Sequence, residues 1–209
     1  MNNISYFSKK YNTLERFISH YHQIEAIRKI KPASILEIGV GNKVVSNFLK
    51  GLGLKVVACD LNPELKPDIV ADIRSLPFEN NSFDVVAAFE VLEHLPFEDF
   101  EKTLKELKRA ARKNVIISLP HACFSFEGLL KLRLDFGKRK IRKGFYLPFK
   151  IPRFWKEIKI EENKEHYWEI GAKNYSKRKI RNIIKKHFKI IEEFSAELNP
   201  YHYFFILEK

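Results

Sequence analysis

Two absences limit the class of protein to which this chain of 209 residues can belong. No stretch of 18 or more uncharged apolar residues occurs, so the sequence predicts no membrane-spanning helix. Residues 1–5 lack the basic region followed by an apolar one that a secretory signal requires. We therefore expect a cytoplasmic, soluble protein, and a hydrophobic content of 45% is enough for a single domain over residues 1–209.

Cysteine and glycine are also scarce. The two cysteines, Cys59 and Cys123, are isolated from each other and show neither a metal-binding nor a redox spacing, so we expect ordinary thiols. Of only eight glycines, Gly39 and Gly41 flank one residue directly after the apolar run at 35–38. A buried strand that ends in this way lets the backbone approach a ligand closely.

An acid closes the next predicted strand about twenty residues later. This residue, Asp60, could accept hydrogen bonds from both hydroxyls of a ribose. A dinucleotide fingerprint would need a third glycine where Val44 stands, and no segment has the phosphate-binding pattern G-x-x-x-x-G-K-[ST]. The remaining nucleoside cofactor is S-adenosylmethionine, whose amino-acid end can lie on a glycine turn and a helix N-terminus.

Hydrophobic patterning predicts alternating strands and helices. An N-terminal helical segment within residues 1–31 has apolar residues at helical spacing: Leu14, Phe17, Ile18, Tyr21, Ile24, Ile27 and Ile30. Strands are expected at 34–38, 55–60, 68–71, 83–89 and 114–119, helices at 43–52, 97–113 and 176–187, and a terminal hairpin at 188–195 and 201–208. The pattern favours an α/β fold: a Rossmann-like, doubly wound, mostly parallel seven-stranded sheet with a C-terminal antiparallel hairpin.

Six short segments, in this order along the chain, resemble the class I S-adenosylmethionine-dependent methyltransferases, especially their small type 11 group. They are Leu36-Glu37-Ile38-Gly39-Val40-Gly41, Asp60-Leu61, Ala71-Asp72-Ile73, Leu76-Pro77-Phe78, Ser82-Phe83-Asp84-Val85-Val86 and Val91-Leu92-Glu93-His94-Leu95. The resemblance implies methyl transfer from S-adenosylmethionine. One departure is Lys43, which stands where the family often has a third alternate glycine.

The resemblance also implies cofactor contacts. Asp60 would bind the ribose, Asp72 with Ile73 would meet the adenine edge, and Glu37 would orient the glycine turn or the cofactor amino group. The full set of expected cofactor-binding residues is Glu37, Gly39, Gly41, Asp60, Leu61, Asp72, Ile73 and Phe89.

The catalytic residue stays open among three histidines, His94, His121 and His166. His94 ends an E-x-x-E-H pattern with Glu90 and Glu93, in a region that faces the methyl group in this family. We predict no metal site, because one Glu-x-x-x-His pair supplies two ligands and no second pair completes the set.

The segment 121–175 stands out as an insertion after the fifth strand. Residues 131–159 contain eleven basic side chains against two acidic ones, a balance of +9, interleaved with aromatic residues. Prolines at 148 and 152 exclude one long helix, and we see no continuous periodicity. We interpret the segment as a lid over the cofactor pocket; the alternative is a solvated positive face that only keeps the protein soluble.

The sequence thus favours a methyltransferase that acts on a small-molecule or lipid-linked acceptor, and whether this acceptor is anionic stays open. An RNA methyltransferase is the first alternative, because basic and aromatic residues can bind phosphates and stack on bases. The second is a non-catalytic protein that binds S-adenosylmethionine. Peripheral contact with a membrane and the oligomeric state stay open.

Overall fold

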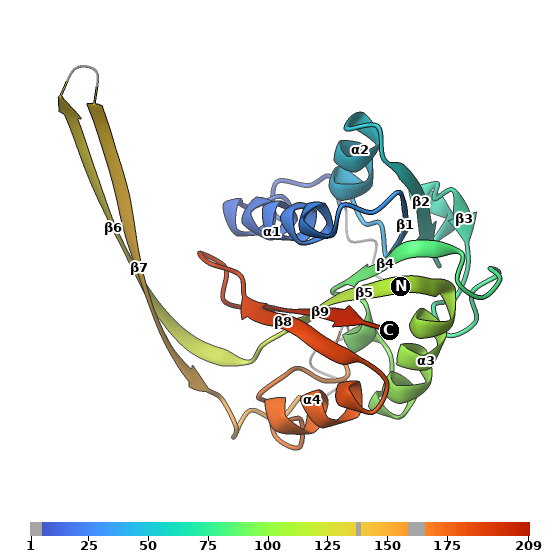
Figure 1. Ribbon diagram of the computed structural model, residues 1–209. Coiled ribbons are helices and arrows are strands. Elements are labelled where there is room, and N and C mark those ends of the chain that lie inside the picture. The colour runs from blue at the N-terminus through green and yellow to red at the C-terminus, as the bar shows by residue number, and fades with distance from the viewer. Residues whose placement is uncertain (1–5, 137–138, 159–165) are drawn as a thin grey trace.

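The computed structural model describes residues 6–136, 139–158 and 166–209. Its centre is a seven-stranded sheet in the order β3-β2-β1-β4-β5-β9-β8 (Figure 1). The strands are β1 (Ser34–Ile38), β2 (Lys55–Asp60), β3 (Ile69–Val70), β4 (Phe83–Phe89), β5 (Ala111–Pro120), β8 (Lys189–Ser195) and β9 (His202–Glu208). The first five strands run parallel, whereas β9 pairs antiparallel with both β5 and β8. The predicted mostly parallel sheet with a C-terminal antiparallel hairpin is confirmed.

Helices cover both faces of this sheet. They are α1 (Leu14–Ile30), α2 (Val44–Gly51), α3 (Phe100–Ala110) and α4 (Lys177–Lys185), with short 3-10 turns η1 (Pro63–Leu65), η2 (Leu92–His94) and η3 (Phe97–Asp99). Side chains of α1 and α2 pack with Ile35 of β1, whereas side chains of α3 and α4 pack with its neighbour Leu36. Successive strand residues point to opposite faces, so a continuous apolar strand supplies two separate cores. In the described part of the chain, no helix has both the length and the apolar character needed to cross a membrane.

Two predictions about the helices need correction. The helix expected over 97–113 spans only Phe100–Ala110, and β5 begins at the next residue because the extended backbone of Ala111 pairs with Phe83 of β4. In α1, three residues of the expected apolar stripe, Leu14, Phe17 and Tyr21, are exposed, whereas His20 and Gln23 are buried. The first half of α1 lies beside the polar pocket described below, so its inward face there is polar.

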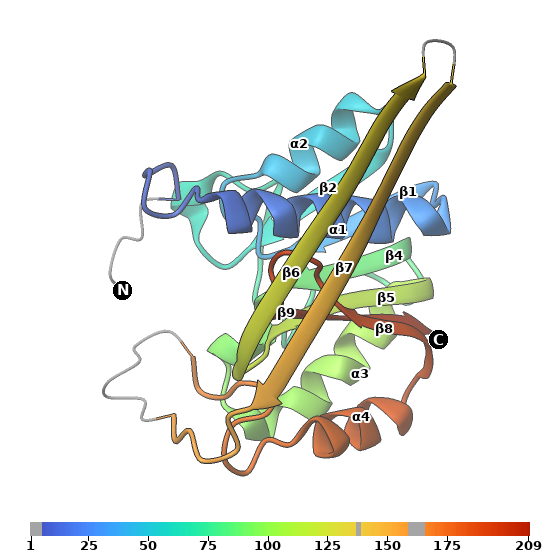
Figure 2. The same cartoon turned by 90° about the vertical axis from the view of Figure 1, so that its left-hand side faces the viewer.

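The insertion forms a separate two-stranded antiparallel ribbon of β6 (Cys123–Phe136) and β7 (Arg139–Pro152). Its far end lies outside the outline of the rest of the chain in both views (Figures 1 and 2). The expectation of a segment without periodicity was wrong, because apolar residues alternate with other residues over much of both strands. Prolines at 148 and 152 are tolerated because each strand of an isolated ribbon has one unpaired edge.

Candidate functional site

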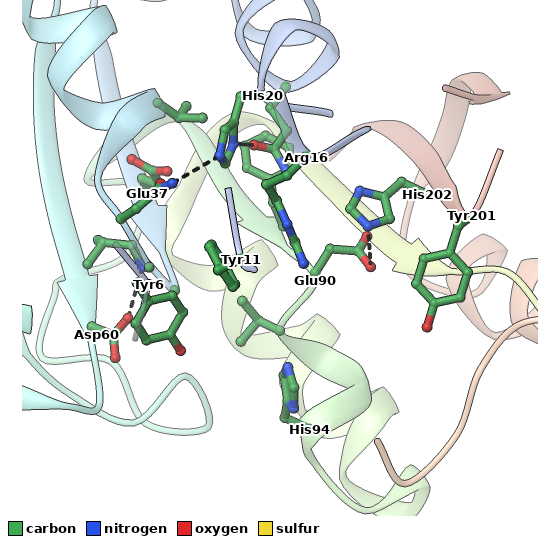
Figure 3. A pocket seen from close by; sticks show the side chains of 18 of the residues that line it. Tyr6, Tyr11, Arg16, His20, Glu37, Asp60, Glu90, His94, Tyr201 and His202 are labelled. Carbon is green, nitrogen blue, oxygen red and sulfur yellow. Dashed lines mark hydrogen bonds and ion pairs between the residues drawn. The ribbon is translucent and has the colours of Figure 1, made fainter. Parts of the chain in front are cut away.

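A pocket opens at the carboxyl ends of β1, β2 and β4, the edge at which parallel sheets bind ligands (Figure 3). One wall comes from the glycine turn after β1 and from Asp60 at the end of β2. The other walls come from α1 and the segment before it, from the residues after β4, and from His166, Tyr201 and His202. Segments from the two ends of the sequence therefore meet around the strand ends.

The glycine turn has a left-handed backbone at both glycines, with φ of 79° at Gly39 and 47° at Gly41. A Cβ at Gly39 would lie 2.3 Å from a methyl carbon of Val91, so only glycine fits there. A Cβ at Gly41 would instead lie 3.4 Å from the hydroxyl of Tyr11, on the pocket side. Lys43 has a φ of 60°, and its ammonium group donates to the carbonyl of Lys66. The turn thus keeps a left-handed third residue despite the missing glycine.

Asp60 ties this turn to the end of β2. One carboxylate oxygen accepts the backbone N–H of Val40 at 2.8 Å, and the other accepts that of Asn62 at 2.9 Å. Each carboxylate oxygen has two lone pairs, so both oxygens retain accepting capacity toward the pocket. This arrangement fits the predicted ribose contact, which stays a prediction.

Glu37 brings a buried carboxyl group to the same pocket. Burial raises its pKa to about 8, and its Oε2 has no hydrogen-bond partner among the described residues. Buried polar atoms in proteins are usually paired, so an unpaired oxygen at a pocket wall suits a ligand that brings a polar group. The predicted contact with the cofactor amino group is consistent with this gap.

The expected adenine contacts lie outside the residues that line the pocket. The Asp72 carboxylate pairs with the guanidinium of Arg74 at 2.6 Å. Ile73 is buried in the core on the α3 side of the sheet, whereas Leu61 is exposed. Phe89 lines the pocket, but its ring also packs at 6.1 Å from that of Phe204. The roles of Leu61, Asp72, Ile73 and Phe89 therefore stay predictions.

Glu90 and His202 form a largely buried polar pair on the opposite wall from Asp60 (Figure 3). Glu90 directly follows β4 with a φ of 54°, and its Oε2 lies 3.5 Å from Nε2 of His202. Burial raises the pKa of Glu90 to about 8 and lowers that of His202 to about 3. Both groups are therefore mainly uncharged at neutral pH. The Ser19 hydroxyl lies 2.6 Å from Nδ1 of His202 and holds the ring in place.

His166 approaches His94 and Glu93, although it is far from both in sequence. The rings of His94 and His166 have centroids 5.0 Å apart, and Nε2 of His166 lies 3.9 Å from Oε1 of Glu93. One ligand atom from each of the three side chains lies within 4.8 Å of the others. The prediction that the chain has no metal site stays a prediction, and sequence spacing alone does not reveal this contact, which is made by a distant segment.

Glu169 fixes the ring of His166 from behind. Its Oε1 lies 3.2 Å from Nδ1 of His166, and its Oε2 accepts the ammonium of Lys156 at 2.7 Å. Burial alone would raise the pKa of Glu169, but the hydrogen bonds from His166 and Lys156 lower it to about 2. An ionised Glu169 favours the proton on Nδ1, which leaves Nε2 of His166 free to accept one.

His121 lies outside the pocket lining. Its backbone N–H donates to the carbonyl of Tyr201 at 2.7 Å, and its ring packs edge-on against Tyr203 at 5.6 Å. Burial lowers the pKa of His121 to about 4. Of the three candidate histidines, His94 and His166 line the pocket, and the packing of His121 favours a structural role.

The N-terminal segment contributes side chains to the pocket lining, which was not predicted from the sequence. Tyr6, Tyr11 and His20 line the pocket, and the Asn42 side chain donates to Oδ1 of Asn12 at 2.8 Å. The sequence signal for this part of the pocket was a pair of polar residues three positions apart, His20 and Gln23, which the structure buries on the inward face of α1. Of the described part of 121–175, the segment interpreted as a lid, only His166 lines the pocket.

Comparisons with known proteins agree with this geometry. A family model described as "Methyltransferase domain" matches residues 36–119. The PH0226 protein of Pyrococcus horikoshii has a similar structure, with 14% identity, a TM-score of 0.61 and coverage of 98% of this chain and 93% of that one. A SAM-dependent methyltransferase from Archaeoglobus fulgidus has 15% identity, a TM-score of 0.60 and coverage of 93% and 94%.

A third similar structure is the magnesium protoporphyrin IX methyltransferase ChlM of Synechocystis, solved with bound SAM. It shares 14% identity at a TM-score of 0.55, over 93% of this chain and 79% of that one. At such identities the likeness supports the fold. No curated protein sequence matches the chain.

Proposed function

We propose that the chain is a class I S-adenosylmethionine-dependent methyltransferase and that it methylates a small-molecule or lipid-linked acceptor bound beside Glu90, His94 and His166. One observation carries the proposal. The glycine turn and Asp60 are joined by the Val40–Asp60 hydrogen bond at one wall of a pocket whose other wall carries these three side chains. One cavity thus has two separate ends: the glycine turn and Asp60 would bind the cofactor, and the other three side chains would bind the acceptor.

The residues at the cofactor end fit S-adenosylmethionine. Gly41 leaves room beside the backbone, Asp60 keeps accepting capacity, and Glu37 has an unpaired oxygen. When bound, the cofactor supplies an electrophilic methyl group on a sulfonium centre. The protein's task is then to hold the acceptor in line and to exclude water. Tyr6 and Tyr11 lie where they would cover the pocket.

His166 is our preferred base for an acceptor hydroxyl or amine that must lose a proton. Its Nδ1 faces the ionised Glu169, so Nε2 can accept a proton while Glu169 stabilises the resulting cation. His94 lies beside it and would contact the acceptor. One protein of similar structure is named as a methyltransferase of magnesium protoporphyrin IX, which is a small molecule. This likeness supports a small-molecule acceptor for the present chain.

The test is a methyl-transfer screen over small metabolites, lipid-linked compounds and RNA, followed by kinetics of His166→Asn on the best acceptor. If His166 is the base, we expect kcat to fall by about 100-fold with little change in the affinity for S-adenosylmethionine. The matched control is His187→Asn, because His187 pairs with Glu101 away from the pocket. Turnover of His166→Asn at the parental rate, with an unchanged pH profile, would remove His166 from this role. RNA as the only substrate would contradict the small-acceptor proposal.

A further inference from the structure

The β6–β7 ribbon has an apolar face that no described part of the chain covers. Residues directly opposite each other in an antiparallel pair share a face, as do residues two apart on one strand. The register places Phe124 opposite Ile151, Phe126 opposite Phe149, and Leu130 opposite Phe145, with Leu132 and Leu147 on the same face. All eight side chains are exposed; Phe126, Leu130 and Leu147 are exposed by 74%, 68% and 70%. A continuous exposed patch of this kind marks an interaction surface.

The opposite face of the ribbon turns toward the body. There the Tyr146 hydroxyl accepts the backbone N–H of Leu198, in the turn before β9, at 3.3 Å. Tyr146 also donates to the carboxylate of Glu127, its neighbour on the same face. These contacts anchor one face of the ribbon to the body, so the apolar face points away from it.

The base of the apolar face carries groups suited to a boundary between water and lipid. The Trp155 ring lies 5.9 Å from that of Phe124, and the Arg153 guanidinium lies 4.7 Å from the centre of the same Phe124 ring. Trp155 is half-exposed. Tryptophan rings concentrate at membrane interfaces, where one part of the ring is apolar and the other is hydrated.

Charge identifies the kind of surface that this face would meet. The described distal parts of the two strands, residues 131–136 and 139–143, contain six basic residues and one acidic residue. Lys131 and Lys143 are exposed, and Lys143, opposite Leu132, lies on the apolar face. A second copy of the same ribbon would bring like charges together, whereas an anionic surface would be attracted.

We propose that the apolar face of the ribbon docks on an anionic lipid bilayer, with Lys143 on that face against the lipid phosphates. The ribbon lies flat at the headgroup level, because the unpaired backbone groups along its two edges cannot enter the hydrocarbon core without loss of hydrogen bonds. Apolar contact and attraction to anionic lipid act together in this mode of binding. The inference does not depend on the proposed methyl transfer, and it brings the pocket to a membrane that could present a lipid-linked acceptor.

The test is cosedimentation of the full chain with phosphatidylcholine vesicles, with and without phosphatidylglycerol. We expect binding at least tenfold tighter to the vesicles that contain phosphatidylglycerol, and weaker binding at high salt. The double variant Phe126→Ser/Phe149→Ser should bind at least tenfold more weakly, because both rings leave the apolar face. Phe48→Ser is the matched control: Phe48 is a half-exposed phenylalanine on α2, and its variant should bind like the parent.

A second variant separates the charge contribution. Each basic residue near an anionic surface changes binding roughly fivefold, so Lys143→Gln, on the docking face, should weaken binding to phosphatidylglycerol vesicles about fivefold. Circular dichroism and S-adenosylmethionine binding check that each variant is folded. The proposal is overturned if the parent stays in solution with anionic vesicles, or if Phe126→Ser/Phe149→Ser sediments like the parent. It is also overturned if ultracentrifugation shows a dimer that this double variant dissociates while vesicles bind neither protein.

Discussion

Asp60→Ala gives the sharpest test of the cofactor end of the pocket. Each Asp60 oxygen already accepts one backbone N–H, from Val40 at 2.8 Å and from Asn62 at 2.9 Å. The substitution therefore removes the predicted ribose acceptors and also releases the glycine turn. Hydrogen bonds to charged groups contribute about 1.5 to 3 kcal/mol each, so we expect the binding free energy of S-adenosylmethionine to weaken by about 2 to 4 kcal/mol. That loss corresponds to a Kd about 30- to 700-fold higher.

Isothermal titration calorimetry measures this change directly, and Asp68→Ala is its matched control. Asp68 also accepts a backbone N–H, from Ala58 at 2.8 Å, but it does not line the pocket. The free energy of unfolding in urea should fall for both variants, and only Asp60→Ala should bind S-adenosylmethionine more weakly. An Asp60→Ala protein that is folded and binds S-adenosylmethionine with the parental Kd would refute the assignment of this pocket edge to the ribose.

Three further predictions concern the pocket and the ion pair behind His166. Gly41→Val should abolish S-adenosylmethionine binding, because a branched side chain would enter the space beside Tyr11, and circular dichroism should show that the variant is folded. If calorimetric titration gives the parental affinity for S-adenosylmethionine, the cofactor binds elsewhere. Lys156→Ala should destabilise the protein by about 2 to 3 kcal/mol in urea unfolding, because the buried Glu169 loses a charged partner; unchanged stability would contradict this. Burial raises the pKa of Glu90 to about 8 in the folded protein. Its contribution to the free energy of unfolding is therefore complete at a pH below the pKa of the same group in the unfolded chain, and it is lost as pH rises through about 8. Glu90→Gln should therefore show a smaller fall in unfolding free energy between acidic and mildly basic pH, and an identical fall would disprove the assignment.

The sheet was predictable because its signals are local. The apolar run that ends at Gly39 and the acid at Asp60 each lie within one strand and its following turn, and short connections force neighbouring parallel strands together. The ribbon was also encoded locally, since apolar residues such as Phe124 and Phe126 recur every second position. Two prolines and the high charge hid that alternation, so the segment was interpreted as irregular. A period of two in a basic segment is still a strand signal.

The acceptor end could not be predicted in the same way, because it is assembled from segments far apart in the chain. His166 meets Glu93 and His94 only because Tyr167 donates its backbone N–H to the Glu93 carbonyl at 2.8 Å and Ile170 bridges to His121. Neither contact has a sequence pattern. His20 and Gln23 were overlooked for a different reason: a helix beside a ligand pocket has a polar inward face, which reverses the usual inference from amphipathicity.

Asn12→Ala tests whether the N-terminal segment controls access to the pocket. The Asn12 side chain donates to the carbonyls of Tyr6 at 2.8 Å and Ser8 at 3.0 Å, and it accepts from Asn42 beside the glycine turn. It therefore both shapes the segment that carries the pocket-lining Tyr6 and holds this segment on the turn. Loss of about 1 kcal/mol of hydrogen bonding should speed S-adenosylmethionine dissociation about fivefold. Because Asn12 does not itself line the pocket, the effect should appear in the dissociation rate measured by stopped-flow fluorescence, with little change in association. Asn80→Ala, which removes a surface acceptor of Arg109, is the control. Equal dissociation rates for the parent and both variants would mean that the segment does not retain the cofactor.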